Sequence, residues 1–278
     1  MKPQFLIITA ISCTLLLNHS CTKETDTSKI HLLKIVKTTW EGSRDVAVYN
    51  YDNLNRLRDI KYKDYDKDFI EVFNYGPDGN LISFETDNER YSKSTYYYTT
   101  DKIDYIIHSY TTNNNVLQND TAIFSYNSEG KLTSLIYRNH YILNQNFYIC
   151  DDKGRLTMEV TMYNDSSWYT WSPEGNLTRR IDKQRNYETG GYNTYITDYI
   201  YDTHSNFFKA IPYPKQMLFL RSLYPGPRES ANNCLSSNLF NYLPLSTGPF
   251  VYSDFNSEGY PTKITAEETT YELIYGEY

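Results

Sequence analysis

Positive charge is in short supply in this sequence of 278 residues. The chain has 27 Lys and Arg residues against 34 Asp and Glu residues, which gives a formal net charge of −7. It therefore offers no basic surface of the kind that neutralises a phosphate backbone, and we expect no nucleic acid among its partners. The composition is otherwise that of an ordinary globular chain, 40% hydrophobic and 22% charged, which excludes wholesale disorder.

The motifs of the common enzyme classes are absent as well. There is no G-x-S-x-G nucleophile elbow, no G-x-x-x-x-G-K phosphate loop and no H-E-x-x-H zinc motif. The run from Asp64 to Asp68 resembles the start of a calcium loop. At the later positions where such a loop needs Gly and Glu, the chain has Phe69 and Tyr75, so we interpret the run as an acidic hairpin loop. No two histidines have metal-site spacing: His19, His31, His108, His140 and His204. We therefore expect no cofactor, no metal site and no catalytic residues.

Long apolar runs are limited to one, from Phe5 to Leu17. Its 13 uncharged residues are too few to span a bilayer but fit the apolar region of a signal peptide. Leu17-Asn18-His19-Ser20-Cys21 follows it and resembles a relaxed lipoprotein signal, which implies cleavage before Cys21 and lipidation of that cysteine. There are two alternatives. One is a plain secreted protein in which Cys21 is incidental, and the other is an N-terminal membrane anchor.

These features predict a signal peptide at residues 1–20 and a flexible tether at 21–30. The expected location is the outer membrane of a Gram-negative bacterium, where the lipid anchor makes the membrane a partner. Glu24 and Asp26 loosely resemble the acidic export signal of Bacteroidetes-type lipoproteins. A solvated linker explains them equally well, so the protein is expected to face either the periplasm or the cell surface.

Tyrosine, in contrast, is abundant. The chain has 30 Tyr, 12 Phe and 3 Trp residues but only 12 Gly and 4 Met. Aromatic side chains of this kind favour pleated, half-wet surfaces, where the ring packs on its neighbours and the hydroxyl reaches water. The composition therefore predicts an all-β protein.

A degenerate repeat organises the chain from about residue 40. Each copy has an aromatic residue, a polar turn and then an apolar residue, usually Leu. The clear copies are Tyr51 to Leu57, Tyr75 to Leu81, Tyr126 to Leu132, Cys150 to Leu156 and Trp171 to Leu177. Tyr201 to Phe207 and Phe255 to Pro261 are looser, and Tyr98 to Ile103 is a shortened copy. A period of 20 to 30 residues corresponds to one supersecondary unit.

The repeat is a β-hairpin. Its turns suit a three-to-five-residue connection in which one residue has a positive φ: Asn55, Gly79, Gly130, Gly154, Gly175 and Gly259. The flanking segments alternate with the period of two that is typical of strands. We predict a long antiparallel meander of about 14 to 16 strands in a single domain, residues 31–278, strongly coiled or closed into a barrel-like sheet.

The Y-D-x-x-G-x-L pattern resembles the tyrosine-aspartate repeats of Rhs-type proteins. Its place behind a lipoprotein signal resembles uncharacterised Bacteroidetes lipoproteins with a predicted porin-like β fold, over residues 40–278. The closest matches are Tyr201-Asp202 and the segment Glu258 to Ile264, whereas Cys150 departs from the pattern. The resemblance implies a fold but no activity. Cations on one strand face, as in Ile60 to Lys63, favour a soluble sheet over a pore.

A Pro-rich stretch at 210–249 interrupts the repeat and holds six of the ten prolines. We expect a long insertion with a short helix, lying across an end or the mouth of the sheet and suited to ligand contact. Trp168, Tyr96 and Tyr97 are the candidates for stacking on sugar rings, with cross-strand packing as the alternative. Cys150 and Cys234 could form a disulfide. The alternative, which we favour for Cys150, is a small buried side chain.

The sequence favours a lipid-anchored envelope protein that acts as a non-catalytic binding or scaffold module for glycan or protein ligands. A glycan-active hydrolase on a β scaffold and a purely structural envelope protein are the alternatives. An Asp/Glu pair in one cleft would favour the hydrolase.

Overall fold

A computed structural model describes residues 30–63, 68–88, 90–112, 116–139, 143–222, 230–235, 250–266 and 269–277. The expected signal peptide, Cys21 and nearly all of the tether lie outside these residues. No helix in the described ranges is long and apolar enough to cross a membrane.

The described chain is almost entirely β. The strands are β1 (Ile30–Thr39), β2 (Gly42–Tyr51), β3 (Leu57–Lys63), β4 (Asp68–Tyr75), β5 (Leu81–Asn88), β6 (Arg90–Thr99), β7 (Lys102–Thr111), β8 (Leu117–Tyr126), β9 (Leu132–Arg138), β10 (Leu143–Cys150), β11 (Leu156–Thr161), β12 (Ser166–Trp171), β13 (Leu177–Arg185), β14 (Tyr192–Asp198), β15 (Tyr201–Ser205), β16 (Asn232–Cys234), β17 (Val251–Phe255), β18 (Pro261–Ala266) and β19 (Thr269–Glu277). A 3₁₀ turn, η1 (Phe207–Ala210), and one helix, α1 (Lys215–Ser222), complete the described elements.

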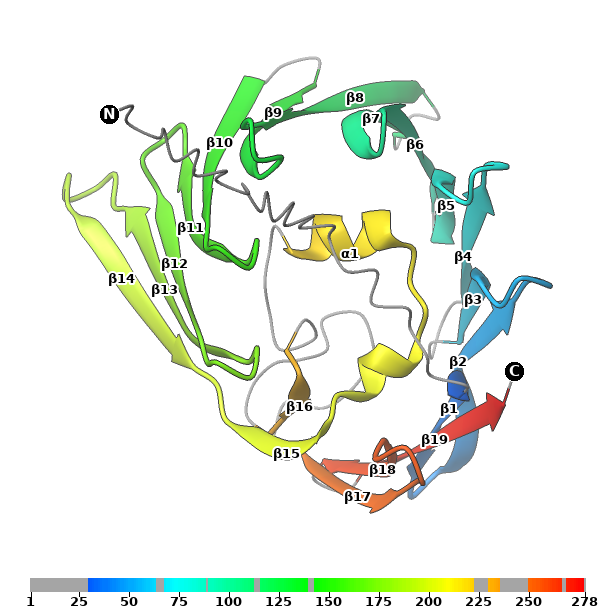
Figure 1. Cartoon of the computed structure of the whole chain (residues 1–278). Helices are drawn as coiled ribbons and strands as arrows, with labels where there is room; N and C mark the ends of the chain where they lie inside the picture. Colours follow the sequence, from blue (N-terminus) through cyan, green and yellow to red (C-terminus); the bar gives the residue numbers. More distant parts are fainter. Residues whose placement is uncertain are drawn as a thin grey trace, which may run out of the picture.

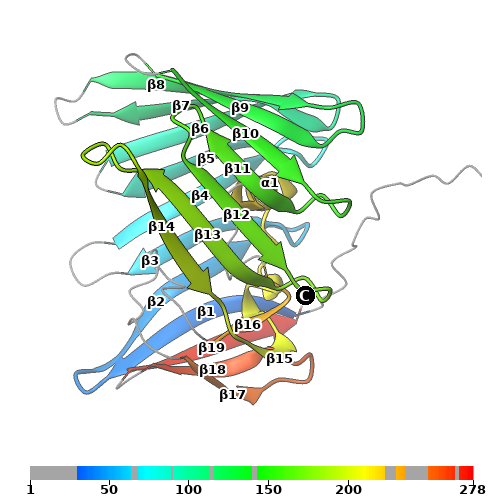
Figure 2. The ribbon, with the colours of Figure 1, turned by 90° about the vertical axis from the view of Figure 1, so that its left-hand side faces the viewer.

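One antiparallel sheet of 17 strands forms the wall of the molecule. From β1 to β14 each strand pairs with the next, and the other side of β1 pairs with β19, which continues to β18 and β17. The sheet curls into a ring when it is viewed end-on (Figure 1), with its strands steeply inclined in the side view (Figure 2). The predicted all-β antiparallel meander is confirmed.

Between β14 and β17, the small sheet of β15 and β16 links the two ends of the large sheet. Three backbone hydrogen bonds make this link. Tyr199 N donates to Thr178 O (3.0 Å), Leu235 N donates to Ile200 O (2.7 Å), and Phe250 N donates to Leu235 O (3.2 Å). These bonds connect β13 to the segment before β17, so the insertion takes part in the wall at this point.

The turns of the repeat form for local reasons. All six residues predicted to need a positive φ adopt one, from 58° at Asn55 to 99° at Gly175. The polar residue that follows the aromatic residue of the repeat caps the turn with its side chain. Asp52 Oδ1 accepts hydrogen bonds from the backbone N–H groups of Leu54 and Arg56, both at 2.9 Å. The aspartate of the tyrosine-aspartate pattern is therefore a turn-stabilising residue.

The aromatic residue of each repeat ties its hairpin to the preceding one. Tyr75 Oη donates to the carbonyl oxygen of Leu57, the last residue of the preceding repeat, at 2.8 Å. The same kind of bond, between 2.5 and 3.0 Å, is made by the repeat residues Tyr51, Tyr98, Tyr126, Trp171 and Tyr201, and also by Tyr252 and Tyr275, which lie outside the repeat copies. The periodic aromatic residues thus form a ladder of side-chain-to-backbone hydrogen bonds along the sheet, which we call the anchor ladder.

Cys150 interrupts the anchor ladder. It occupies the slot of an aromatic residue, but in the described part of the chain its thiol makes no bond to the Leu132 carbonyl, the expected acceptor. Cys150 is half-buried and Cys234 is buried, and both are free thiols. Cys234 thus serves as a small buried side chain.

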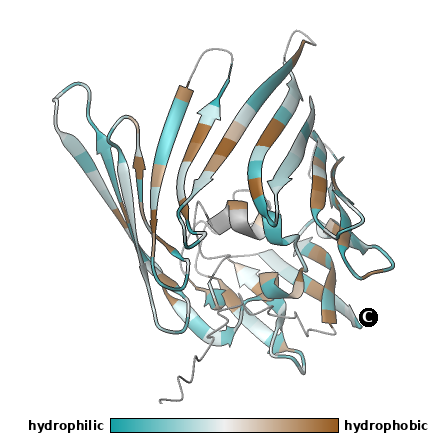
Figure 3. Ribbon diagram, turned by 45° about the horizontal axis from the view of Figure 1, so that its top comes forward, coloured by the Kyte–Doolittle hydropathy of each residue, from teal (hydrophilic) through white to brown (hydrophobic). Residues whose placement is uncertain are grey.

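The described residues of the Pro-rich insertion, 210–222 and 230–235, pack against the inside of the ring. Apolar and polar residues alternate along the strands (Figure 3), the buried core residues lie on the inner face, and α1 lies within the ring (Figures 1 and 2). Tyr213 meets the ring of Phe73 edge-on at 6.4 Å between ring centroids. Gln216 Nε2 donates to Asn80 Oδ1 at 2.9 Å. Asn80 lies in the turn between β4 and β5, and Asn232 of the insertion pairs with Asn176 in the turn between β12 and β13, so the described part of the insertion reaches the end of the ring that carries the repeat turns.

Candidate functional site

The predicted sugar-stacking residues do not form one platform. Tyr96 on β6 points inward and is only 5% exposed, and its hydroxyl donates to Met217 Sδ of α1 at 3.3 Å. Its neighbour Tyr97 points outward, because successive side chains of a strand face opposite sides. The prediction for Tyr96 is therefore corrected: its ring is part of the core and not free to stack on a ligand.

The other two candidates lie on the outer face, six strands apart. Tyr97 stacks on Tyr105 of β7, with 4.3 Å between ring centroids and 11° between ring planes. Trp168 on β12 is half-buried between its cross-strand partners Met158 and Ile181. Both residues thus make the cross-strand contacts that were the alternative interpretation.

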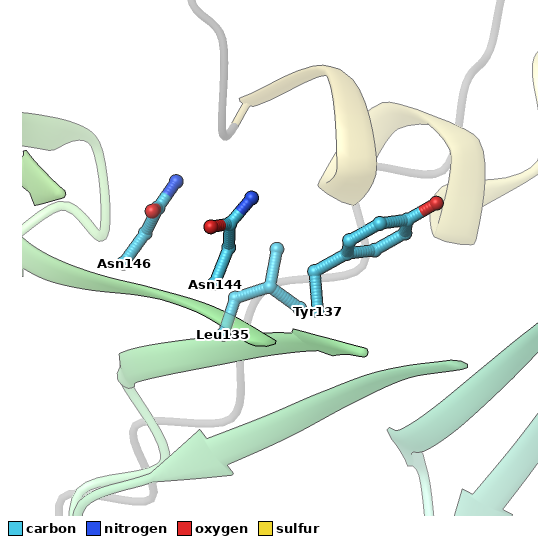
Figure 4. A pocket seen from close by; sticks show the side chains of 4 residues that line it. All are labelled: Leu135, Tyr137, Asn144 and Asn146. Atoms are coloured by element: carbon cyan, nitrogen blue, oxygen red, sulfur yellow. The ribbon is translucent and has the colours of Figure 1, made fainter. Parts of the chain in front are cut away.

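The structure instead brings polar side chains together on the inner face of β9 and β10. Leu135 and Tyr137 stand opposite Asn146 and Asn144 in the register of the two strands. These four side chains line a cavity of about 290 Å³ and point into the interior of the ring (Figure 4). The volume is close to the lower end of the range of about 300–1,000 Å³ for ligand pockets. We call this feature the inner-wall cavity.

Two lining residues each donate a hydrogen bond to a buried carboxyl group. The Tyr137 hydroxyl donates to Asp120 Oδ2, and Asp120 is only 5% exposed. Burial and this bond to Asp120 raise the pKa of Tyr137, so the phenol stays protonated. Asn146 Nδ2 donates to Glu159 Oε1 at 2.8 Å. The oxygen atoms of Tyr137 and Asn146 and the second Nδ2 hydrogen of Asn146 are what remains for a ligand.

Asn144 differs from its neighbours on the wall. Its Oδ1 is buried, and within the described ranges no donor lies within hydrogen-bond distance of it. A buried oxygen without a donor costs about 1–3 kcal/mol, so such groups usually have a partner in water or ligand. Because this oxygen is closed off, a ligand in the cavity does not reach it, and the rest of the Asn144 side chain is what lines the cavity.

A polar network continues from the cavity along the inner wall. Ser167 of β12 stands between Glu159 of β11 and Asp182 of β13 in the strand register. Asp182 Oδ1 accepts hydrogen bonds from Ser167 Oγ at 2.6 Å and from Arg180 Nε at 2.8 Å. Burial raises the pKa of Glu159, although the bond from Asn146 and the charge of Arg180 oppose that shift. The wall thus holds a carboxyl group that is easily protonated beside one that is paired with a cation.

On the other side of the cavity the wall carries a histidine. His108 Nδ1 and Ser94 Oγ are 3.0 Å apart, and His108 stands opposite Asp120 in the register. Burial lowers the pKa of His108, against the smaller raising effect of Asp120, so the imidazole is neutral at pH 7. His108 therefore adds no positive charge to this side of the cavity.

Sequence reasoning missed the inner-wall cavity although a signal was present. In β10 the inward positions 144, 146 and 148 are Asn, Asn and Tyr, and the neighbouring inner wall carries the buried carboxyl groups of Asp120 and Glu159. A polar stretch on the buried face of a strand indicates either a hydrogen-bond network or a binding site. Finding it required knowledge of which face pointed inward.

Comparison with known proteins yields structural resemblance only. No protein-family model matches the chain, and no curated protein matches it. A porin-like protein from Bacteroides vulgatus is similar over 88% of this chain and 98% of its own, at 14% identity and a TM-score of 0.40. A porin-like protein from Bacteroides uniformis is similar over 88% and 96%, at 15% identity and a TM-score of 0.37.

The third similar structure is a toxin chain, described as TcdB2-TccC3-TEV, which is 16% identical over 58% of this chain with a TM-score of 0.32. This chain spans only 11% of the length of that toxin chain. Solved structures similar to this chain thus include both Bacteroides porin-like proteins and a TccC-containing toxin.

Proposed function

We propose that the protein is a lipid-anchored envelope protein that binds a small polar ligand, a sugar unit of a glycan, in the inner-wall cavity. The observation that carries the proposal is the inner-wall cavity of about 290 Å³ itself, which Tyr137, Asn144 and Asn146 line with polar side chains inside the ring. Sugar hydroxyls both donate and accept hydrogen bonds, which suits a lining of amide and phenol groups. Leu135 gives the cavity an apolar patch, as sugar sites require for the faces of the ring.

A purely structural role explains this wall less well. A scaffold gains stability when inward positions are apolar, because each polar group taken from water needs a compensating partner. Here the inner wall combines Asn144, Asn146, Glu159 and Asp182 with a cavity beside them. Retaining these groups is costly for a scaffold and useful for a binding site.

The location of the protein is proposed from the sequence alone. The apolar run before Cys21 supports lipidation of that cysteine and a place in the outer membrane. Growth with radiolabelled palmitate tests it. Label should appear in the wild-type protein and disappear in Cys21→Ser; label that persists in Cys21→Ser would contradict the anchor at this residue.

Glycan-array binding of the purified chain tests the binding function, with Asn144→Leu as the test variant and Gln145→Leu as its control. Gln145 is the next residue of β10 and faces the opposite side of the sheet. We expect saturable binding that is lost in Asn144→Leu and kept in Gln145→Leu. Binding of a protein partner only, or no binding of any glycan, would contradict the glycan proposal.

A glycan hydrolase is the second candidate, and one observation favours it. Glu159 and Asp182 lie on the inner face two strands apart, which places them about 9.5 Å from each other at a strand spacing of ~4.8 Å. This is the spacing of the two backbone positions; inverting glycosidases hold their carboxyl groups about 6.5–9.5 Å apart, a separation that the side chains of two residues at this spacing can reach. Glu159, with its raised pKa, would be the general acid and Asp182 the base.

Product analysis on the same array samples separates the two functions. The binding proposal predicts that no glycan is cleaved by the wild-type chain. Release of a reducing sugar that stops in both Glu159→Gln and Asp182→Asn would establish the hydrolase in its place.

A further inference from the structure

We propose that Ser94, His108 and Asp120 form a row of nucleophile, base and carboxylate that hydrolyses carboxylic esters on the inner wall. The substrate class is an ester of a short acyl group, such as an acetyl group on a hydroxyl of a glycan. The ester chemistry rests on the geometry of these residues. The glycan half of the substrate rests on the proposed function, because the row lies beside the inner-wall cavity.

The members of the row are neighbours on successive strands. Ser94 of β6 stands opposite His108 of β7, and His108 stands opposite Asp120 of β8 in the strand register. Cross-strand partners have Cβ atoms about 4.5–5.5 Å apart, so the imidazole lies between the hydroxyl and the carboxylate. Ser94 Oγ and His108 Nδ1 are 3.0 Å apart, which is the separation expected of a nucleophile and its base.

The row faces the interior of the ring. Tyr96, two positions after Ser94 on β6, points inward to α1, so Ser94 shares that face. Ser94 and His108 are both partly exposed, whereas Asp120 is buried. Asp120 Oδ2 accepts the hydrogen bond from Tyr137, which lines the inner-wall cavity. The nucleophile is thus accessible, and the carboxylate behind it is shielded from water.

The surroundings of His108 keep it in the form that a base needs. Burial lowers the pKa of His108, so the imidazole is neutral at pH 7 and can accept a proton. In the tautomer with the proton on Nε2, Nδ1 accepts the hydrogen of the Ser94 hydroxyl. The charge of Asp120 raises the pKa of His108 to a smaller extent, so it stabilises the imidazolium that forms during the reaction. Asp120 is therefore a positioning residue that acts through His108.

Each turnover consumes one ester and one water molecule. Ser94 Oγ attacks the carbonyl carbon of the ester as its proton moves to His108 Nδ1. The bond between that carbon and the alcohol oxygen breaks, and His108 gives the proton to the departing alcohol. Water then attacks the acyl carbon and passes a proton to His108, the bond to Ser94 breaks, and Ser94 Oγ regains its proton as the carboxylic acid leaves.

A fluorophosphonate probe, which phosphonylates activated serine hydroxyls, tests the nucleophile on the purified full chain. We expect label at Ser94, located by peptide mass spectrometry, and none there in Ser94→Ala. His108→Asn should slow labelling by about 100-fold or more, because general base catalysis contributes about 10²–10⁴-fold. The matched control is Ser92→Ala, two positions earlier on the same face of β6, which should label like the wild type. Label on another residue only, or no label, would overturn the inference.

The pH dependence of labelling tests the role of Asp120. The titratable groups of this part of the wall are Asp120, Tyr137, which donates to it, and Tyr110, whose ring stacks on His108 with 5.5 Å between centroids. Asp120→Asn removes the charge that raises the pKa of His108, so labelling should be slower and its pH midpoint lower. A slower rate with an unchanged pH midpoint would overturn this role. The thermal midpoint by circular dichroism confirms that each variant is folded.

Acetate release from acetylated xylan oligomers separates the esterase from the binding function. Release that is lost in both Ser94→Ala and Asn144→Leu would support the two together. Label at Ser94 with hydrolysis of p-nitrophenyl acetate, but not of the acetylated xylan, would support the esterase and overturn its glycan substrate. Glycan binding that is lost in Asn144→Leu, without any label at Ser94, would overturn the esterase and leave the binding function standing.

Discussion

Replacing Tyr75 with phenylalanine removes one hydroxyl from the anchor ladder and leaves the ring in place. The hydroxyl donates to Leu57 O at 2.8 Å, and burial strongly raises the pKa of Tyr75, as expected for a phenol withdrawn from water. The Arg56 guanidinium lies over the ring, 4.3 Å from its centroid, and should remain there in the variant. The change therefore isolates the hydrogen bond between two successive hairpins.

The expected loss is about 1 kcal/mol in the free energy of unfolding, because a net hydrogen bond contributes about 0.5–1.5 kcal/mol. In a chain of this size, ~1 kcal/mol lowers the thermal midpoint by about 2–4 °C. Circular dichroism at the β-sheet band measures the midpoint. The control is Tyr97→Phe, on the outer face, where Tyr97 is stacked on Tyr105. We expect less than about 0.5 kcal/mol there, as for surface changes in general.

An equal fall in the two variants would refute this reasoning, since the loss would then come from removing any tyrosine hydroxyl. An unchanged midpoint in Tyr75→Phe would show that the ladder bond makes no net contribution. A second ladder variant, Tyr126→Phe, should behave like Tyr75→Phe, because Tyr126 Oη donates to Ile103 O at 2.9 Å.

Three further predictions concern stability. Cys150→Tyr supplies the missing donor to the Leu132 carbonyl and should raise the thermal midpoint by about 2–4 °C, equivalent to ~1 kcal/mol; an unchanged or lower midpoint would contradict it. Gly79→Ala should lower the free energy of unfolding by about 1–2 kcal/mol in chemical denaturation, because φ is 80° there. The cost is conformational, since no atom lies within 4 Å of the added Cβ. Gly79→Asn should cost less, since Asn55 adopts φ 58° in the matching turn. Glu159→Gln should stabilise the protein at pH 7 but not at pH 4. Burial raises the folded-state pKa of Glu159 above its ordinary value of 4.5, so the contribution of this group is favourable below 4.5 and is lost as the pH rises through the folded pKa. A midpoint difference that is the same at both pH values would contradict that last prediction.

The hairpins were predictable from sequence because their causes are local. A positive φ at Gly79 or Asn55 and a capping side chain such as Asp52 act within a few residues of chain. Seven such units in order indicate a meander without any knowledge of distant contacts. The anchor ladder, in contrast, joins residues about 15 to 25 positions apart, and the sequence showed only its periodicity.

The candidate site was not predictable in the same way. Tyr96 and Tyr97 are adjacent, and a difference of one position decides whether a ring is buried against α1 or lies on the outer face. The inner-wall cavity depends on the same choice for Asn144 and Asn146, and also on where the insertion packs. Both choices are settled by long-range packing, which the local sequence does not encode.

A crystal structure of the chain soaked with its best array ligand is the most direct test of the inner-wall cavity as the binding site. The account predicts ligand density inside the ring, against Tyr137, Asn144 and Asn146. Density on the outer face, against Trp168 or against Tyr97 and Tyr105, would contradict it and return the binding site to the exposed aromatic side chains.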